Sequence, residues 1–238
     1  KIAFQKIQKI IKDFKPDIVH THASKAGAIG RRAAYKAGIN QIYHTFHGHV
    51  FHSYFGPLKT NIYKNIERNL AKKSTKIIAI SETQKHELYY IHKICPKEKI
   101  VVIPLGFDLE KFQVKKIEKR KKFRNEWGVK ENEVAIGIIG RLVPIKNHQF
   151  FIDIIEKTIK KTNKNLRFFI VGDGEEKQNL IKYTRFKNID LSTNKTPATV
   201  QFTSWIKDID IVNAGLDIIC LCSKNEGTPV SLIEAQAS

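Results

Sequence analysis

The sequence predicts an α/β protein with two Rossmann-like domains that face a cleft. Short runs of apolar, β-type residues alternate along the chain with amphipathic helical segments, which is the pattern of a parallel sheet. A charged stretch interrupts this alternation, which then begins again. We therefore expect a first domain over 1–110, a linker region over 111–133 and a second domain over 134–238. No apolar run approaches the ~20 residues of a membrane-spanning helix.

The first domain is expected to start with a helix. Apolar residues recur at helical spacing over Ile2–Phe14, and Pro16 ends that segment. Ser24 is expected to cap the next helix, and Ser81-Glu-Thr-Gln84 has the form of a capping box. The predicted strands of this domain are Asp17–His22, Gln41–Phe46, Lys76–Ile80 and Lys99–Ile103, and a further helix is predicted over Pro57–Lys73.

The second domain repeats the alternation after a charged helix over Ile117–Trp127. Its predicted strands are Val134–Ile139, Leu166–Val171, Val200–Thr203 and Leu216–Leu221, and its helices are Asn147–Lys161, Glu175–Arg185 and one that begins near Pro229. Ligands of such sheets bind at the carboxyl ends of the strands. The loops that follow the strands are therefore the places to look for chemistry.

The chain is strongly basic and the charge is uneven. The 238 residues carry a formal charge of +19, and residues 1–105 hold 19 Lys and Arg against 6 Asp and Glu. A lysine-rich coding bias accounts for part of this charge. The asymmetry indicates a basic surface on the first region that attracts anions, such as phosphorylated substrates or anionic lipid. We find no helix-turn-helix, zinc-finger or RNA-binding signature, so nucleic acid is not an expected partner. The three cysteines are typical of a reducing compartment.

A basic loop follows the strand Val134–Ile139. Gly140 lets the chain turn sharply, Arg141 can grip a phosphate with two hydrogen bonds, and Lys146 adds a point charge. This combination suits the diphosphate of a leaving nucleotide, although a solvated basic loop is an equally simple interpretation.

Two carboxylates separated by seven residues flank the start of the last helix. Glu226 precedes that helix and Glu234 lies inside it, so both can reach hydroxyl groups beside an anion held by the backbone N–H groups from about Gly227 to Ser231. The spacing is specific only in combination with the basic loop.

Six of the nine histidines lie between His20 and His52. No acidic or cysteine residue accompanies them, so a metal site is not expected. His47, at a strand end beside a glycine, suits a polar cleft residue. His20 and His44 are expected to be buried and hydrogen-bonded.

Taken in order, these loops resemble the family-four glycosyltransferases, which have the GT-B fold. The stretches that carry the resemblance are Pro16–His22, Ser24–Arg31, His44–His49, Val102–Asp108, Gly140–Lys146, Val171–Gly174 and Glu226–Glu234. The resemblance implies transfer of a sugar from a nucleotide-sugar, with retention of configuration, without a bound metal or other cofactor. It places the donor in the second domain and the acceptor in the first.

The resemblance also implies roles for individual residues. Arg141 and Lys146 would neutralise the departing diphosphate, Glu226 would hold donor-sugar hydroxyls and Glu234 the ribose, and His47 would touch the donor sugar near the reacting carbon. The catalytic set is thus His47, Arg141, Lys146 and Glu226. The donor-binding set is Gly140, Arg141, Lys146, Gly172, Gly174, Glu226, Gly227, Thr228, Pro229, Val230, Ser231 and Glu234. The acceptor-side set is His20, His22 and His49.

The implied partners are a nucleotide-sugar, expected to be UDP-linked, and a glycan or polyprenyl-linked acceptor. Many members of the family act at the cytoplasmic face of the membrane, and the basic first region fits contact with anionic lipid. Two alternatives are a sugar epimerase of the same architecture and a homologue that only binds nucleotide-sugars.

The chain departs from the family pattern at both ends. The family's first strand and glycine-rich loop are expected upstream of Lys1, and a further strand and helix beyond Ser238. Leu105 stands where asparagine is frequent, and Thr228 replaces a commoner apolar residue or glycine. We expect this length of chain to be inactive or poorly folded, because its first sheet lacks central strands.

Overall fold

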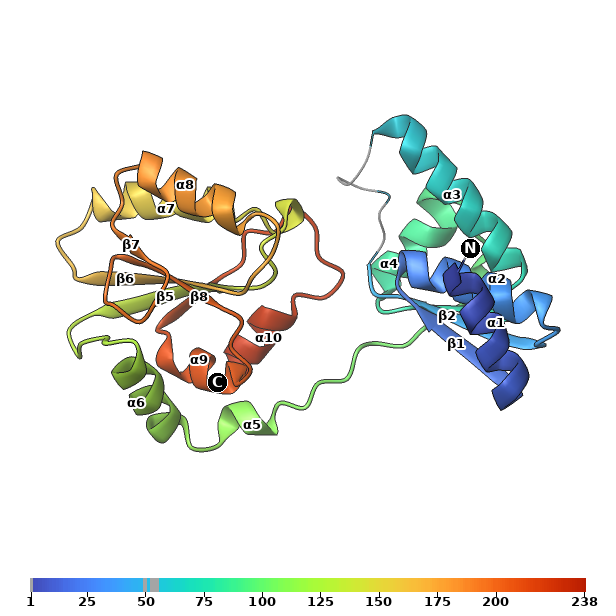
Figure 1. The fold of residues 1–238 in the computed structure, drawn as a ribbon, viewed down its shortest axis with the longest axis horizontal. Helices are drawn as coiled ribbons and strands as arrows, with labels where there is room; N and C mark the ends of the chain where they lie inside the picture. The colour runs from blue at the N-terminus through green and yellow to red at the C-terminus, as the bar shows by residue number, and fades with distance from the viewer. Residues whose placement is uncertain (1, 49–50, 52–55) are drawn as a thin grey trace. The chain divides into compact units, whose positions relative to one another are not determined.

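A computed structural model describes residues 2–48, 51 and 56–238 of the chain. It forms two compact units, shown in Figure 1. The first unit comprises Lys1–Gly106 with Glu226–Thr228, and the second comprises Phe107–Asn225 with Pro229–Ser238. Among the described residues, no helix is both long and apolar enough to cross a bilayer.

The first unit contains a parallel sheet of four strands in the order β1-β2-β3-β4. The strands are β1 (Ile18–His22), β2 (Gln41–Phe46), β3 (Lys76–Ala79) and β4 (Ile100–Val102). These are the four predicted strands, shortened by a residue or two except at β2. The helices of the unit are α1 (Ile2–Phe14), α2 (Ser24–Lys36), α3 (Pro57–Lys72) and α4 (Glu82–His86).

The starts of α3 and α4 have the residues that the sequence predicts there, whereas the start of α2 does not. Pro57 occupies the first turn of α3, and the Ser81 hydroxyl accepts a hydrogen bond from the Gln84 N–H at the start of α4, as predicted. The prediction that Ser24 caps α2 is wrong. Ser24 is already helical, and Ala23 precedes it with a φ of 59°, so the turn is set by the backbone and not by a side-chain cap.

The core of the first unit lies between the sheet and its helices. Apolar side chains from β2, β3 and β4 pack with Leu88 and Ile94, and α1 packs on α2 through Ile7 and Ile11. The residues at the carboxyl ends of β1 and β2 include His22 and His47, which are polar and lie outside this core.

The second unit contains a parallel sheet of five strands in the order β7-β8-β6-β5-β9. The strands are β5 (Val134–Ile139), β6 (Leu166–Val171), β7 (Leu191–Ser192), β8 (Val200–Ser204) and β9 (Ile218–Cys220). The helices are α5 (Glu110–Gln113), α6 (Lys116–Glu126), α7 (His148–Ile159), α8 (Lys177–Phe186), α9 (Ile209–Gly215) and α10 (Val230–Ala237). The sequence did not predict β7, α5 or α9.

Helices cover both faces of this sheet, with α7 and α8 on one side and α6 and α9 on the other (Figure 1). Side chains along β6 alternate accordingly. Phe168 packs with α7 and α8, whereas Phe169 packs with Phe123 and Trp127 of the α6 segment. The charged stretch over 111–133 thus supplies part of a hydrophobic core. Because both faces are covered, the open edge at the carboxyl ends of the strands is where a ligand can approach.

Candidate active site

The loop after β5 is fixed by backbone hydrogen bonds to the loop after β6. The Gly140 N–H donates to the Val171 carbonyl at 2.9 Å, and the Leu142 N–H donates to the Asp173 carbonyl at 3.0 Å. These bonds continue the β5–β6 pairing beyond the strands. The predicted basic loop and the predicted glycine turn therefore lie against each other at the carboxyl edge of the sheet.

Two glycines permit this close contact. A Cβ atom added to Gly172 would lie 2.0 Å from the Gly140 carbonyl oxygen, and one added to Gly174 would lie 2.4 Å from the Leu142 carbonyl oxygen. Gly172 also has a φ of 141°, which L-residues rarely adopt. The result is a pair of tightly packed loops at the carboxyl edge of the sheet, with Gly172 buried and Gly140 and Gly174 half-buried.

Both predicted cations belong to this loop. A short 3-10 turn over Pro144–Lys146 returns the chain toward Gly140, so a Cβ atom on Gly140 would lie 3.7 Å from Lys146 Cε. Lys146 is half-buried, while Arg141, directly after Gly140, is exposed. The loop therefore places one half-buried and one exposed cation beside the glycine backbone.

Asp173 holds the loop after β6 in shape. Its carboxylate accepts hydrogen bonds from Lys177 Nζ at 2.8 Å, from the Gly174 N–H at 2.8 Å and from the Ser204 hydroxyl. The hydrogen bonds from Lys177 and Ser204 lower the pKa of Asp173 to about 2. The carboxylate therefore stays charged at neutral pH. We assigned no role to Asp173 from the sequence, although a lysine four residues after a turn aspartate is a recognisable signal of such an ion pair.

The segment after β9 is tied to the basic loop. The Lys224 N–H donates to the Ile145 carbonyl at 2.9 Å, next to Lys146. Pro229 occupies the cap position of α10, with Val230 and Ser231 as the first helical residues.

The two glutamates of the predicted motif have different surroundings. Glu234 lies within α10, and partial burial raises the pKa of its carboxyl, against the opposing effect of Lys111. Glu226, Gly227 and Thr228 are grouped with the first unit.

In the first unit, polar side chains gather at the carboxyl ends of β1 and β2. His20 Nε2 lies 2.8 Å from Thr45 Oγ1, and His22 Nδ1 lies 2.9 Å from His47 Nε2. The structure therefore brings together three of the predicted histidines, His20, His22 and His47. The remaining one, His49, lies outside the described residues. Within the described residues, no three His, Cys, Asp or Glu side chains are placed to hold a metal ion.

The other face of the same strands buries His44. Its Nδ1 lies 2.9 Å from the Thr21 hydroxyl, which itself donates to the Tyr43 carbonyl, so His44 Nδ1 must carry the hydrogen. Burial and the nearby Arg31 lower the pKa of His44 to about 3. Burial of His44 agrees with the prediction. The prediction that His20 is buried is wrong, because it lies on the opposite, exposed face of β1.

Two family models cover most of the chain. Residues 2–111 match Glycosyltransferase Family 4, and residues 119–238 match Glycosyl transferases group 1. The chain belongs to the family-four glycosyltransferases.

A bacterial relative agrees with this membership, and a solved structure shares the fold. The UDP-Gal:alpha-D-GlcNAc-diphosphoundecaprenol alpha-1,3-galactosyltransferase of Escherichia coli is 34% identical over 241 residues, which cover 98% of this chain and 58% of that protein. Anabaena HepE, crystallised with UDP and glucose, superposes with a TM-score of 0.80 at 20% identity, over 97% of this chain and 60% of HepE. The fold is GT-B. The chain spans about three fifths of the length of these two proteins.

A partial match extends to a second bacterial enzyme with a lipid-linked acceptor in its name. The GalNAc-alpha-(1->4)-GalNAc-alpha-(1->3)-diNAcBac-PP-undecaprenol alpha-1,4-N-acetyl-D-galactosaminyltransferase of Campylobacter jejuni is 31% identical over 105 residues. The match covers 44% of this chain and 27% of that protein.

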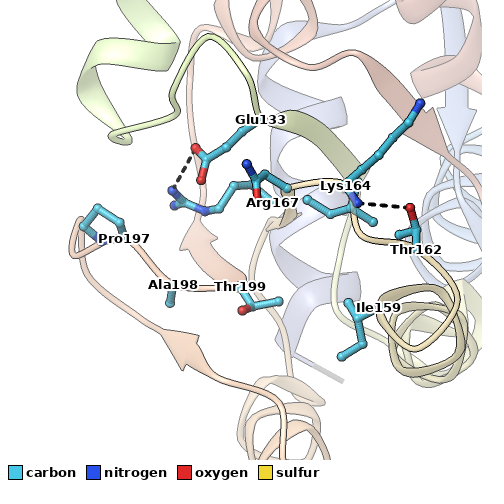
Figure 2. A pocket seen from close by; sticks show the side chains of 10 residues that line it. Glu133, Ile159, Thr162, Lys164, Arg167, Pro197, Ala198 and Thr199 are labelled. Atoms are coloured by element: carbon cyan, nitrogen blue, oxygen red, sulfur yellow. Dashed lines mark hydrogen bonds and ion pairs between the residues drawn. The ribbon is translucent and has the colours of Figure 1, made fainter.

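The opposite edge of the second sheet has a hollow of about 390 Å³ near the starts of β6 and β8 (Figure 2). It contains none of the predicted site residues. Arg167, at its wall, donates to the carbonyls of Trp127 and Gly128 and lies 3.8 Å from the Glu133 carboxylate. These contacts join α6 to the sheet, so we interpret this edge of the second unit as structural.

Proposed function

We propose that this chain forms the donor and acceptor surfaces of a retaining glycosyltransferase that moves a sugar from a UDP-linked donor to a lipid-linked or free glycan. The observation that carries the proposal is the basic loop over Gly140–Lys146, bonded along its backbone to the glycine turn over Gly172–Gly174. A tight backbone turn at the carboxyl edge of the sheet, with two cations beside it, suits a diphosphate, which is the leaving group in such a transfer.

On the donor side, Arg141 and Lys146 would neutralise the charge that develops on the departing diphosphate. Stabilisation of developing charge by groups already in place usually contributes more to catalysis than any other single effect. The first N–H groups of α10, at Val230 and Ser231, offer a further anion site. Glu226 would bind hydroxyl groups of the donor sugar and Glu234 the ribose, with Gly227, Thr228 and Pro229 forming the backbone between them.

In the first unit, His47 would contact the donor sugar near the reacting carbon. His20 and His22 line the same exposed face of β1 and would meet the acceptor, together with His49. We assign no nucleophile, and retention of configuration is part of the proposal.

A lipid-linked acceptor is supported by the specificity of the Escherichia coli relative, whose name gives a diphosphoundecaprenol-linked sugar as its acceptor. The charge of the first region is consistent with this, since each Lys or Arg near an anionic membrane adds about 1 kcal/mol of attraction. We therefore propose peripheral contact with the cytoplasmic face of the membrane. Vesicle co-sedimentation at low salt tests this, and equal retention of the protein by neutral and anionic vesicles would contradict it.

Titration calorimetry of the chain with UDP, GDP, ADP and their sugars tests the donor site. We expect one nucleotide to bind and Arg141→Ala to weaken its affinity by roughly 10- to 100-fold, since a hydrogen bond to a charged group contributes about 1.5–3 kcal/mol. Arg185→Ala is the matched control, because Arg185 is an exposed arginine in the last turn of α8. A chain that is folded by circular dichroism yet binds none of these ligands would overturn the donor-site assignment.

A further inference from the structure

The exposed histidines of the first unit follow from the register of β1 and β2. His20 and His22 lie on one face of β1, where they are paired with Tyr43 and Thr45 of β2. Each imidazole contacts the residue two positions after its own pairing partner, so His20 meets Thr45 of β2 and His22 meets His47, directly after β2. The strand pairing itself therefore sets the contact between the two rings.

The His22–His47 contact is a hydrogen bond between two ring nitrogens. His22 Nδ1 and His47 Nε2 are 2.9 Å apart, and the two rings stack with centroids 5.1 Å apart at 26°. At this distance one hydrogen lies between the nitrogens. Two protonated imidazoles would direct N–H groups at each other, so the contact tolerates at most one added proton.

We propose that His22 is a positioning residue for His47: it fixes the orientation of that ring, and the two imidazoles form one acid–base unit that holds at most one added proton. This inference rests on the proposed function, in which His47 contacts the sugar.

Protonation of the unit decides what His47 presents to a ligand. His47 Nε2 is occupied by His22, so Nδ1 is the nitrogen left for a substrate. Whichever ring carries the added proton, His47 Nδ1 then bears a hydrogen and can only donate. In the neutral unit, Nδ1 donates when His22 supplies the shared hydrogen and accepts when His47 supplies it. A charged unit therefore binds a sugar hydroxyl through its oxygen lone pair.

The neighbours of the unit disfavour a second charge. The His20 ring on β1 lies beside the His22 ring, with centroids 4.3 Å apart and the ring planes tilted by 42°. His44 of β2 lies on the far face, near Arg31 of α2, which is paired with Glu67 of α3. Partial burial first, and the His22 ring second, lower the pKa of His47. The His47 ring is therefore expected to be largely neutral at neutral pH.

Nuclear magnetic resonance of the full 238-residue chain with ¹⁵N-labelled histidine tests this inference between pH 5 and 8. We expect the His47 nitrogens to show one midpoint, with a single proton added to the contact as the pH falls. In His22→Ala, His47 should take up a full proton alone, with its pKa raised because the effect of the His22 ring is lost. In His22→Asn, the amide can still donate to His47 Nε2, so His47 Nδ1 should stay protonated across the range.

His86→Ala is the control, because His86 is an exposed histidine of α4 and its removal should leave the His47 titration unchanged. A His47 titration that is also unchanged by His22→Ala and His22→Asn would overturn the inference. If the circular dichroism spectrum shows that His22→Ala does not fold, the result for His22→Asn alone tests the inference. Nucleotide binding is measured separately through Arg141, so a coupled histidine pair in a chain that binds no nucleotide would refute the function and leave the pair standing.

Discussion

Gly172 lies so close to Gly140 that a Cβ atom on Gly172 would come within 2.0 Å of the Gly140 carbonyl oxygen. The reverse substitution has room, since a Cβ atom on Gly140 meets only the Lys146 side chain at 3.7 Å or more. The two facing glycines therefore differ in what they tolerate, and this difference can be measured.

Gly172→Ala is expected to lower the free energy of unfolding of the second unit by about 3 kcal/mol. Overlap in a packed site costs about 1–3 kcal/mol, and the φ of 141° adds strain of about 1–2 kcal/mol for a residue with a side chain. Gly140→Ala is the matched control: its Cβ atom has space, so only the strain of its φ of 159° remains, which costs about 1–2 kcal/mol. Both tryptophans, Trp127 and Trp205, lie in this unit, so urea unfolding followed by their fluorescence provides the measurement. Equal costs for the two substitutions would show that the loops do not touch as described.

Lys146 is expected to act on the nucleotide through its charge and on the loop through its alkyl chain. Lys146→Met keeps an unbranched apolar chain over Gly140 and removes the ammonium, whereas Lys146→Ala removes both. We expect both variants to weaken nucleotide affinity by roughly 10-fold or more. The stability of the methionine variant should stay within about 0.5 kcal/mol of the parent. Calorimetry and urea unfolding together check this, and full affinity in Lys146→Met would exclude a role for the charge.

The sequence predicted the elements whose signal is local. The strand bounds of β2, β5 and β6 came out as expected, because each is an apolar run bounded by polar or turn residues. The helix α9 was missed, since its sequence is short and contains β-branched residues and a terminal Gly215. It forms a helix because it packs on α6, where Gly215 leaves room for the ring of Phe123. That contact joins residues far apart in the sequence.

The candidate site divides in the same way. Glycines and cations after the strands could be identified one loop at a time, and their bonding to each other followed from a parallel sheet. The Asp173 bond to Ser204 spans 31 residues and depends on the neighbouring positions of β6 and β8, which no local pattern reveals. The face on which His20 lies could not be decided from alternation alone, because β1 has a polar residue on each face.

Arg31 and Glu67 form a buried ion pair, with Arg31 Nη2 2.6 Å from Glu67 Oε2 and side-chain exposures of 0% and 5%. Removing one partner leaves a buried charge, so Glu67→Gln is expected to cost about 3–5 kcal/mol. The double variant Arg31→Met with Glu67→Leu should cost less than Glu67→Gln alone, because no charge remains to be buried. Urea unfolding followed by circular dichroism measures both. Additive losses in a double-mutant cycle would indicate that the two side chains act independently.

His44 is expected to make the stability of the first unit depend on pH. Its pKa is lowered from the ordinary 6.5 to about 3 in the folded chain, so between these values the unfolded chain binds a proton that the folded chain does not. Stability contributed by the neutral ring is therefore complete above about pH 6.5 and falls as the pH drops toward 3. The slope is at most about 1.4 kcal/mol per pH unit. His44→Asn removes this ionisation, so its unfolding free energy should fall less steeply between pH 7 and 5. The exposed His86→Ala should retain the parent slope. Parallel slopes for the parent and His44→Asn in urea unfolding at pH 7, 6 and 5 would show that His44 is not held neutral by burial.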